Sequence, residues 1–262
     1  MHRFFIKNFQ ENNNLPISLE QIRHQLKNVL RLRKDDLIEV FDETSFEYLL
    51  KILDDDCDFG KIISKKIRQF EIYPEVVLCQ AFIKNDRFEL ILEKTSELGI
   101  TQIIPMISER VQGGSKLKVK NPKHLRWQKI IKEAVEQSDG NIIPKLEAFY
   151  TLKDLLELFK KDEKIIFYEK SEVLKEGYDI QDLKPCLIKL ASKTGKHKIN
   201  KIVIFIGPVG GFSLSEILMA KDYGCNIVSL GDRVLKAETA AISSVSVIRY
   251  QFQGFISGKN RC

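Results

Sequence analysis

Short apolar runs alternate with polar positions through the first 70 residues, and this pattern predicts a small, mostly β module. The expected strands are Leu37–Phe41, Phe46–Leu53 and Lys61–Ile67, and Asp54-Asp55-Asp56 marks a turn. A helix is expected after Ser18, because Gln21 follows three residues later as in a capping box. The apolar residues with helical spacing in that segment are Leu19, Ile22, Leu26, Val29 and Leu30.

From Tyr73 onward the pattern changes to strands that alternate with helices. The expected strands are Val76–Phe82, Ile103-Ile104, Ile165–Tyr168, Ile202–Ile206 and Ile227–Leu230. The expected helices are Asp86–Leu98, one that starts at Pro122, Leu152–Phe159, one capped by Ser213 and Glu216, and Ala237–Phe255. The helix after Pro122 would bury Leu125, Ile130, Ile131, Ala134 and Val135. This alternation predicts an α/β domain with a mostly parallel sheet, separated from the β module near Gln69–Pro74.

Composition places the chain among globular proteins. It has 262 residues, of which 44% are hydrophobic and 30% charged. No apolar run approaches the ~20 residues of a membrane-spanning helix, and the first residues are too short an apolar stretch for a signal peptide. The five cysteines are scattered without a C-x-x-C pair, and the four histidines lack ligand spacing. We therefore expect a cytoplasmic protein without a membrane contact or a bound metal.

The net charge of +6 is unevenly distributed. Residues 1–72 carry 12 Lys and Arg against 13 Asp and Glu, so the remaining residues carry 30 against 23. No acidic residue lies between Glu109 and Glu133, whereas eight basic residues do. Such a stretch attracts polyanions. The alternative is a solvated loop and helix face.

A glycine-rich segment follows the apolar strand Ile202–Ile206. It reads Gly207-Pro-Val-Gly-Gly-Phe-Ser213, and in open α/β sheets ligands bind beyond the carboxyl ends of the strands. Glycines there let a ligand approach the backbone closely. The spacing is neither the dinucleotide-binding G-x-G-x-x-G nor a P-loop. Taken alone, the segment is also compatible with a structural turn.

A second strand exit, Leu230-Gly-Asp-Arg-Val-Leu-Lys-Ala-Glu-Thr-Ala240, leads into the last helix. We expect the two glycine loops to leave neighbouring strands and to wall one pocket. Small residues follow at Ala240, Ala241, Ser243 and Ser244, and they suit close packing of a ligand or of another helix.

Together these two segments resemble the RsmE-type family of ribosomal RNA methyltransferases, which belongs to the SPOUT class. Further similar segments are His2-Arg3-Phe4-Phe5, His24 with Val29-Leu30-Arg31, Lys84 with Glu93–Gly99, Ser108-Glu109-Arg110, and Trp127 through Ser138 to Pro144. The resemblance therefore covers nearly the whole chain.

The resemblance implies a PUA-like β-barrel RNA-binding domain over residues 1–72 and a SPOUT-type knotted α/β domain over residues 73–262. It implies a homodimer that uses S-adenosylmethionine to methylate N3 of a uridine. The substrate would be small-subunit (16S) ribosomal RNA within the assembled small subunit. The topological rules used for the sheet give no indication of a knot.

The resemblance also implies roles for individual residues. The expected cofactor-binding residues are Ile206, Gly207, Gly210, Gly211, Leu230, Gly231, Leu235 and Thr239. Lys236 and Arg110 are candidate cations beside the uridine. Glu238 is a candidate proton acceptor, or else a carboxylate at a helix N-terminus. The expected RNA-binding residues are Arg3, His24, Arg31, Lys116, Lys118 and Lys120. Taken alone, His24 is more typical of an ordinary histidine on a helix surface, and the surrounding resemblance is what favours RNA binding.

Three positions depart from the family pattern. Val209 stands where the family has Glu, Lys236 where it has Arg, and Gly140 close to where it has Arg. Lysine keeps the charge but lacks the planar two-pronged donor of arginine. Two other functions stay open, and the departures support the first. One is an RNA-binding protein without catalysis, and the other is a small-molecule enzyme that uses the same loops.

Overall fold

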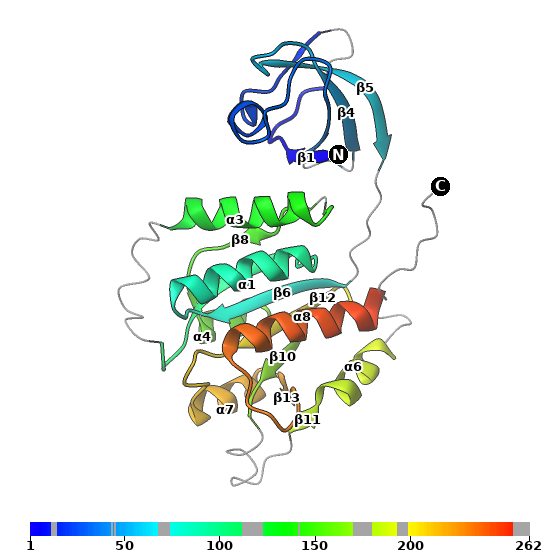
Figure 1. Ribbon diagram of the computed structural model, residues 1–262. Coiled ribbons are helices and arrows are strands. Elements are labelled where there is room, and N and C mark those ends of the chain that lie inside the picture. The colour runs from blue at the N-terminus through cyan, green and yellow to red at the C-terminus, as the bar shows by residue number, and fades with distance from the viewer. Residues whose placement is uncertain are drawn as a thin grey trace. The chain divides into compact units, whose positions relative to one another are not determined.

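A computed structural model describes residues 1–11, 15–42, 44, 46–67, 74–111, 123–140, 142–169, 180–192 and 199–253 (Figure 1). The chain forms two compact units. One comprises Met1–Glu71 with Lys132–Ile143, and the other comprises Ile72–Ile131 with Pro144–Cys262. The expected domain boundary at residues 72 and 73 stays a prediction, because residues 68–73 lie outside the described part. The sequence did not indicate that Lys132–Ile143 joins the first unit.

The first unit contains a curled five-stranded sheet in the order β1-β3-β4-β5-β2 (Figure 1). Its strands are β1 (His2–Phe5), β2 (Ile17–Ser18), β3 (Leu37–Phe41), β4 (Phe46–Ile52) and β5 (Phe59–Ile67). Strands β3, β4 and β5 pair antiparallel in sequence order, and β1 pairs parallel with β3. The three expected strands and the small β module are therefore confirmed.

The helix expected after Ser18 is shorter than the pattern predicted. Ser18 ends β2, and the helix η1 covers Gln25–Val29 with π-type hydrogen bonding. The Gln21 side chain makes no capping box, because it accepts from Lys7 N at 3.1 Å and donates to Lys7 O at 2.9 Å. The capping-box prediction at this position is wrong, although the apolar spacing did identify buried residues. Those buried residues are Leu19, Ile22 and Leu26.

The second unit contains a parallel sheet in the order β11-β13-β10-β12-β6-β7-β8, with β9 also pairing with β7. Its strands are β6 (Glu75–Ala81), β7 (Gln102–Ile107), β8 (Lys145–Leu146), β9 (Tyr150–Thr151), β10 (Glu163–Phe167), β11 (Gln181–Asp182), β12 (Lys201–Ile206) and β13 (Asn226–Ser229). The parallel α/β sheet and its five expected strands are confirmed. The pattern missed β8, β9 and β11, which have two residues each.

Helices cover both faces of this sheet (Figure 1). They are α1 (Asn85–Glu97), α4 (Leu152–Leu158), α6 (Leu183–Ala191), α7 (Leu214–Asp222) and α8 (Ala237–Gln253). A further helix, α3 (His124–Gln137), begins in this unit and ends in the first. Helices α1 and α6 pack against α8, whereas α4 packs against α7. The sequence predicted all of these except α6. It wrongly assigned Leu125 to the buried face of α3, where its side chain is 80% exposed.

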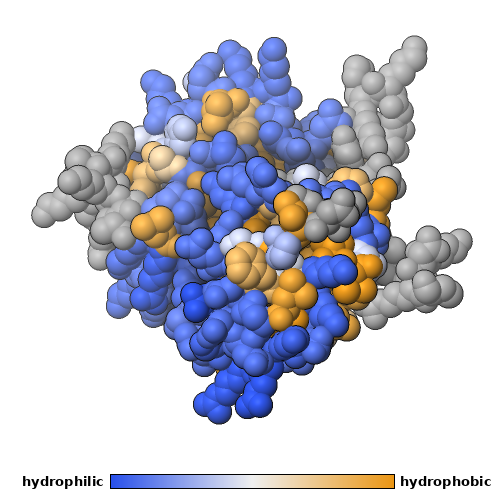
Figure 2. All heavy atoms as spheres, turned by 90° about the horizontal axis from the view of Figure 1, so that it is seen from above, coloured by the Kyte–Doolittle hydropathy of each residue, from blue (hydrophilic) through white to orange (hydrophobic). Residues whose placement is uncertain are grey.

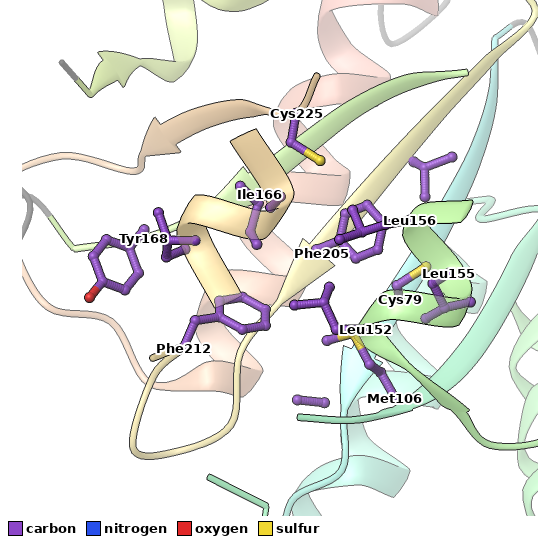
Figure 3. Packing of buried hydrophobic residues seen from close by; sticks show 14 of the residues in the cluster. Cys79, Met106, Leu152, Leu155, Leu156, Ile166, Tyr168, Phe205, Phe212 and Cys225 are labelled. Carbon is purple, nitrogen blue, oxygen red and sulfur yellow. The ribbon is translucent and has the colours of Figure 1, made fainter. Parts of the chain in front are cut away.

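A hydrophobic cluster lies between the sheet and helices α4 and α7. It combines alternate residues of β6 and β12, such as Cys79 and Phe205, with Leu152, Leu155 and Leu156 of α4. Figure 3 shows Phe212, just beyond β12, pointing toward this cluster. The core therefore fixes the segment that leaves the carboxyl end of β12.

The surface is mostly polar. Hydrophilic residues cover most of the face shown in Figure 2, and hydrophobic residues form smaller patches among them. Within the described ranges, no helix combines the length and the apolar character needed to cross a membrane.

Candidate functional site

The two glycine segments leave strands that end at the same edge of the parallel sheet. Strand β12 ends at Ile206 and β13 ends at Ser229, but they are not neighbours, because β10 pairs with both. The expectation that the loops leave adjacent strands is therefore wrong. The end of β10 lies between them, which brings a third strand exit into the site.

The glycine loop, Gly207–Ser213, is built on a tight turn. Gly211 N donates to Pro208 O at 2.9 Å, and Gly211 has φ +68°, a conformation that L side chains rarely adopt. Phe212 is buried beneath the loop. A Cβ atom on Gly207 would lie 3.2 Å from Phe212 Cδ2, so the packing of this ring favours glycine at position 207. Glycine is thus favoured at positions 207 and 211 by the packing and the backbone of the loop itself, and the close approach of a ligand stays a prediction.

The second loop, Leu230–Lys236, begins with a turn held by Ser229. The buried Ser229 hydroxyl donates to Gly231 O at 2.9 Å, and Gly231 N approaches the same hydroxyl at 3.2 Å. Gly231 has φ +118°, which again favours glycine. At the other end of the loop, Ala240 N donates to Lys236 O at 2.8 Å and closes the first turn of α8.

A cavity of about 580 Å³ opens between these loops. This volume lies within the ~300–1,000 Å³ of typical small-molecule sites. The lining residues are Arg87, Arg110, Phe167, Tyr168, Glu169, Ile206, Gly207, Pro208, Val209, Gly210, Gly211, Phe212, Ser229, Leu230, Gly231, Asp232, Arg233, Val234, Leu235, Lys236, Ala237 and Ala240. The cavity therefore combines backbone groups, apolar side chains and charges of both signs.

Most of the expected cofactor-binding residues meet at this cavity. Ile206, Gly207, Gly210, Gly211, Leu230, Gly231 and Leu235 all line it. Thr239 does not, and its side chain is exposed on α8.

The three candidate catalytic residues occupy different places. Arg110 and Lys236 both line the cavity and are exposed. Glu238 does not line it, and its Oε1 lies 3.7 Å from Arg87 Nε. Two cations from separate loops thus face the same space, whereas the carboxylate lies beside an arginine.

Arg110 contacts the glycine loop directly. Its Nη1 donates to Gly210 O at 2.8 Å. The preceding residue, Glu109, donates its backbone N–H to the buried carboxylate of Glu216 at 2.9 Å. Glu216 also accepts from Ser213 N at 2.9 Å and completes the expected capping box of α7, which is confirmed.

The expected RNA-binding residues are differently placed. Arg3 is 8% exposed, forms an ion pair with Glu47, donates to Gly140 O, and stacks on the Phe41 ring at 4.1 Å. His24 and Arg31 are exposed on either side of η1. Lys116, Lys118 and Lys120 lie outside the described residues. Arg3 therefore has internal partners in the first unit, while His24 and Arg31 have surfaces open to solvent.

The three departures from the family pattern have distinct surroundings. Val209 is 71% exposed on the cavity lining, and Lys236 is exposed there too. Gly140 lies in the first unit, where a Cβ atom would come within 3.0 Å of Val135 Cγ1. Val209 and Lys236 are therefore exposed at the cavity. At position 140, by contrast, Val135 leaves little room for a side chain.

Sequence reasoning missed several lining residues. Phe167 ends strand β10, and Tyr168 and Glu169 follow it. This strand exit carries no glycine, so no motif marked these residues as part of a site. Arg87, Asp232 and Arg233 also line the cavity. The last two lie between Gly231 and Lys236, so their place in the second loop was a signal that could have identified them.

Comparisons with known proteins relate the chain to one group. A family model described as an RNA methyltransferase domain matches residues 71–249. Ribosomal RNA small subunit methyltransferase E from Mesomycoplasma hyopneumoniae (strain 232) is 32% identical over 247 residues, covering 92% of this chain and 96% of that protein. The protein of the same name from Buchnera aphidicola subsp. Schizaphis graminum is 29% identical, with 95% and 96% covered.

Solved structures give the same result. A ribosomal RNA small subunit methyltransferase E from Neisseria gonorrhoeae, bound to S-adenosyl methionine, superposes with a TM-score of 0.75 at 26% identity. The alignment covers 95% of this chain and 97% of that one. A methyltransferase from Legionella pneumophila in complex with the same cofactor gives a TM-score of 0.74 at 28% identity, with 94% and 96% covered.

Proposed function

The chain belongs to the RNA methyltransferase domain family, and on this premise we propose that it methylates N3 of a uridine in 16S ribosomal RNA. The methyl donor is S-adenosylmethionine, which supplies a methyl group on a positively charged sulfur. The observation that carries the proposal is the cavity at the strand exits. It unites both glycine-containing loops with two cations, Arg110 and Lys236.

The residues of the cavity suit this cofactor. Glycines at positions 207, 211 and 231 bring backbone N–H and C=O groups to the surface, as a bound nucleoside requires. Apolar side chains such as Val234 and Leu235 suit an adenine ring, and Glu169 and Asp232 place negative charge around the same cavity. Ile206, Gly207, Gly210, Gly211, Leu230, Gly231 and Leu235 hold the cofactor in this proposal, and Thr239 lies nearby.

The protein's own contribution is mainly electrostatic and geometric. N3 of uridine is nucleophilic only after it loses its proton, and a fixed cation nearby favours the anionic base. Lys236 and Arg110 both line the cavity and provide this charge. The loops position the reactants and exclude water. Glu238 stays a candidate proton acceptor, but its neighbour Arg87 offers it a structural role instead.

Binding of the RNA is assigned to other surfaces. N3 lies on the Watson–Crick edge of the base, so the target uridine must be unpaired or splayed out of a helix. His24, Arg31 and the basic stretch with Lys116, Lys118 and Lys120 contact the phosphate backbone in this proposal. A homodimer that acts in the cytoplasm on the assembled small subunit completes it.

The direct test is mass spectrometry of 16S ribosomal RNA from a strain that lacks the gene. A single methylated uridine should be lost there and should return with the intact gene. Purified protein should also transfer the methyl group to small-subunit particles from that strain.

The three departures favour one competing function, an RNA-binding protein without catalysis. In that case the protein binds the cofactor or the RNA, but the methylation pattern of the deletion strain is unchanged. Electrostatic binding of RNA weakens steeply as the salt concentration rises. A small-molecule enzyme would show no RNA binding of this kind.

A further inference from the structure

Glu216 has a second bond that its place in a helix cap does not explain. A capping box needs one carboxylate oxygen at the third helical residue to accept from the N-cap backbone. Oε2 of Glu216 does this with Ser213 N. Oε1 accepts instead from Glu109 N at 2.9 Å, a residue 107 positions earlier in the chain. The carboxylate is 3% exposed, so both bonds are shielded from water.

The segment reached by this bond is the turn that follows β7, Ser108–Val111. Val111 N donates to Ser108 O at 3.1 Å. The Val111 side chain belongs to the hydrophobic cluster between the sheet and helices α4 and α7. Ser215 Oγ lies 3.2 Å from both carboxylate oxygens of Glu109. The start of α7 therefore holds this turn through the backbone and the side chain of Glu109.

Arg110, the next residue in the turn, crosses back to the glycine loop. Its Nη1–Gly210 O bond of 2.8 Å ends at the loop that leads into α7. The turn is thus held twice, once to α7 through Glu216 and once to the glycine loop through Arg110. Glu216 itself does not line the cavity.

From this geometry we propose that Glu216 is a positioning residue, which holds Arg110 at the cavity by fixing the backbone of Glu109. This inference rests on the proposed function. A guanidinium carries five N–H donors, so the bond to Gly210 leaves others for the RNA substrate. A fixed backbone sets the point from which the Arg110 side chain extends to the cavity. Misplacement of a reacting group by about 1 Å can lower a rate ~100-fold.

The chain itself suggests the variant that separates the two roles of Glu216. Helix α4 has the same capping box with aspartate, in which Asp154 Oδ2 accepts from Thr151 N at 3.2 Å. Glu216→Asp should therefore keep the cap of α7 while its shorter side chain no longer reaches Glu109. The matched control is Asp154→Glu, which makes the reverse substitution at the equivalent position of the α4 cap. Asp154 does not line the cavity.

Single-turnover methylation of small-subunit particles is the main measurement. Glu216→Asp should methylate about 10- to 100-fold more slowly than the parent, with cofactor affinity and melting temperature nearly unchanged. Asp154→Glu should methylate at the parent's rate. Amide hydrogen exchange at Glu109 should be at least tenfold faster in Glu216→Asp, because the N–H has lost its acceptor.

A double-mutant cycle with Arg110→Ala tests whether the effect passes through Arg110. In the Arg110→Ala background, Glu216→Asp should lower the rate no further, because the group that it positions is already absent. The inference is overturned if Glu216→Asp lowers the methylation rate by the same factor in the parent and in Arg110→Ala. It is also overturned if the parent is active and Glu216→Asp leaves its rate unchanged. A parent protein that binds the cofactor but methylates no RNA overturns the proposed function itself.

Discussion

Arg87 Nε lies 3.7 Å from Glu238 Oε1 and joins the first turn of α1 to the first turn of α8. The Glu238 side chain is only 12% exposed, and its Oε2 has no hydrogen-bond partner among the described residues. Arg87 lines the cavity but Glu238 does not. The pair therefore holds one wall of the site, which favours a structural role for Glu238 over proton transfer.

Glu238→Gln distinguishes the two roles. As half of a partly exposed ion pair, Glu238 should contribute about 0.2–1 kcal/mol to stability. We therefore expect a small decrease in melting temperature and a methylation rate within threefold of the parent. General-base catalysis is typically worth ~100- to 10,000-fold. A rate loss of that size, measured in single turnover at saturating cofactor, would assign the proton acceptor to Glu238.

Gly207 and Gly210 should respond differently to substitution. A Cβ atom on Gly207 would lie 3.2 Å from Phe212 Cδ2 and 3.3 Å from the Gly211 carbonyl carbon. Gly207→Ala should therefore lower the free energy of unfolding by about 1–3 kcal/mol, as overpacking does. A Cβ atom on Gly210 meets only Arg110 carbons, at 3.7 and 3.8 Å. Gly210→Val should consequently fold normally but fill the cavity and abolish cofactor binding.

Thermal unfolding and calorimetric titration of S-adenosylmethionine measure these two effects separately. Gly210→Ala is the control, since it adds one carbon in ordinary contact and should keep most of the affinity. A folded Gly210→Val protein with the parent's affinity would show that the cofactor binds elsewhere.

Glu136 should make the stability of the first unit depend on pH. Burial raises the pKa of this carboxyl above its ordinary value of 4.5, although Phe5 N donates to it at 2.7 Å. A raised pKa means that the stabilising contribution is complete below pH 4.5 and is lost as the pH rises through the folded-state value. Glu136→Gln keeps an acceptor for Phe5 but cannot ionise.

Urea unfolding of the parent and of Glu136→Gln, followed by circular dichroism between pH 4 and pH 7, tests this sign. The variant should gain stability relative to the parent as the pH increases. If the free energies of unfolding of the parent and of Glu136→Gln differ by the same amount from pH 4 to pH 7, the assignment of the raised pKa to Glu136 is wrong.

The basic stretch around Lys116, Lys118 and Lys120 should supply electrostatic RNA affinity. Replacing all three with Ala should weaken binding and reduce the slope of log K against log salt by about 2, since each phosphate contact contributes roughly 0.7–0.9. The control replaces Lys153, Lys184 and Lys189, which are exposed on α4 and α6. Equal slopes for the two triple variants would mean that the stretch is only a solvated surface.

The sequence predicted those parts of the site whose signals are local. Ser213 and Glu216 lie three residues apart, and their capping box exists as expected. The same pattern failed at Ser18 and Gln21, because Gln21 bonds to the backbone of Lys7, which lies far outside the motif. The side chain at the third helical position can bond to the helix cap or to a distant backbone group. The sequence pattern shows only the first of these partners.

The order of the strands in the parallel sheet could not be predicted from the sequence either. The chain reaches β13 directly after β12 and α7, yet β10 separates the two strands in the sheet. The strand exits of the cavity therefore include Phe167, Tyr168 and Glu169, which no motif marked. The bond between Glu109 and Glu216 was invisible for the same reason, since it joins residues 107 positions apart.

Lys236 provides the sharpest test of the proposed chemistry. Its side chain lines the cavity, while its backbone carbonyl accepts from Ala240 N at 2.8 Å to begin α8. Lys236→Ala should preserve that backbone bond and hence the helix start. The charge matters mainly as the uridine anion develops, so the variant should methylate about 100-fold more slowly with little change in cofactor affinity.

Lys236→Arg is the matched substitution, because it keeps the charge and adds a planar donor. It should methylate at least as fast as the parent in single turnover on small-subunit particles. If Lys236→Ala is as fast as the parent, the reacting base lies beside Arg110 rather than Lys236, and Arg110→Ala should then show the loss. If the parent binds cofactor without methylating, the protein without catalysis is favoured, and Val209, which lines the cavity, is the position to restore first.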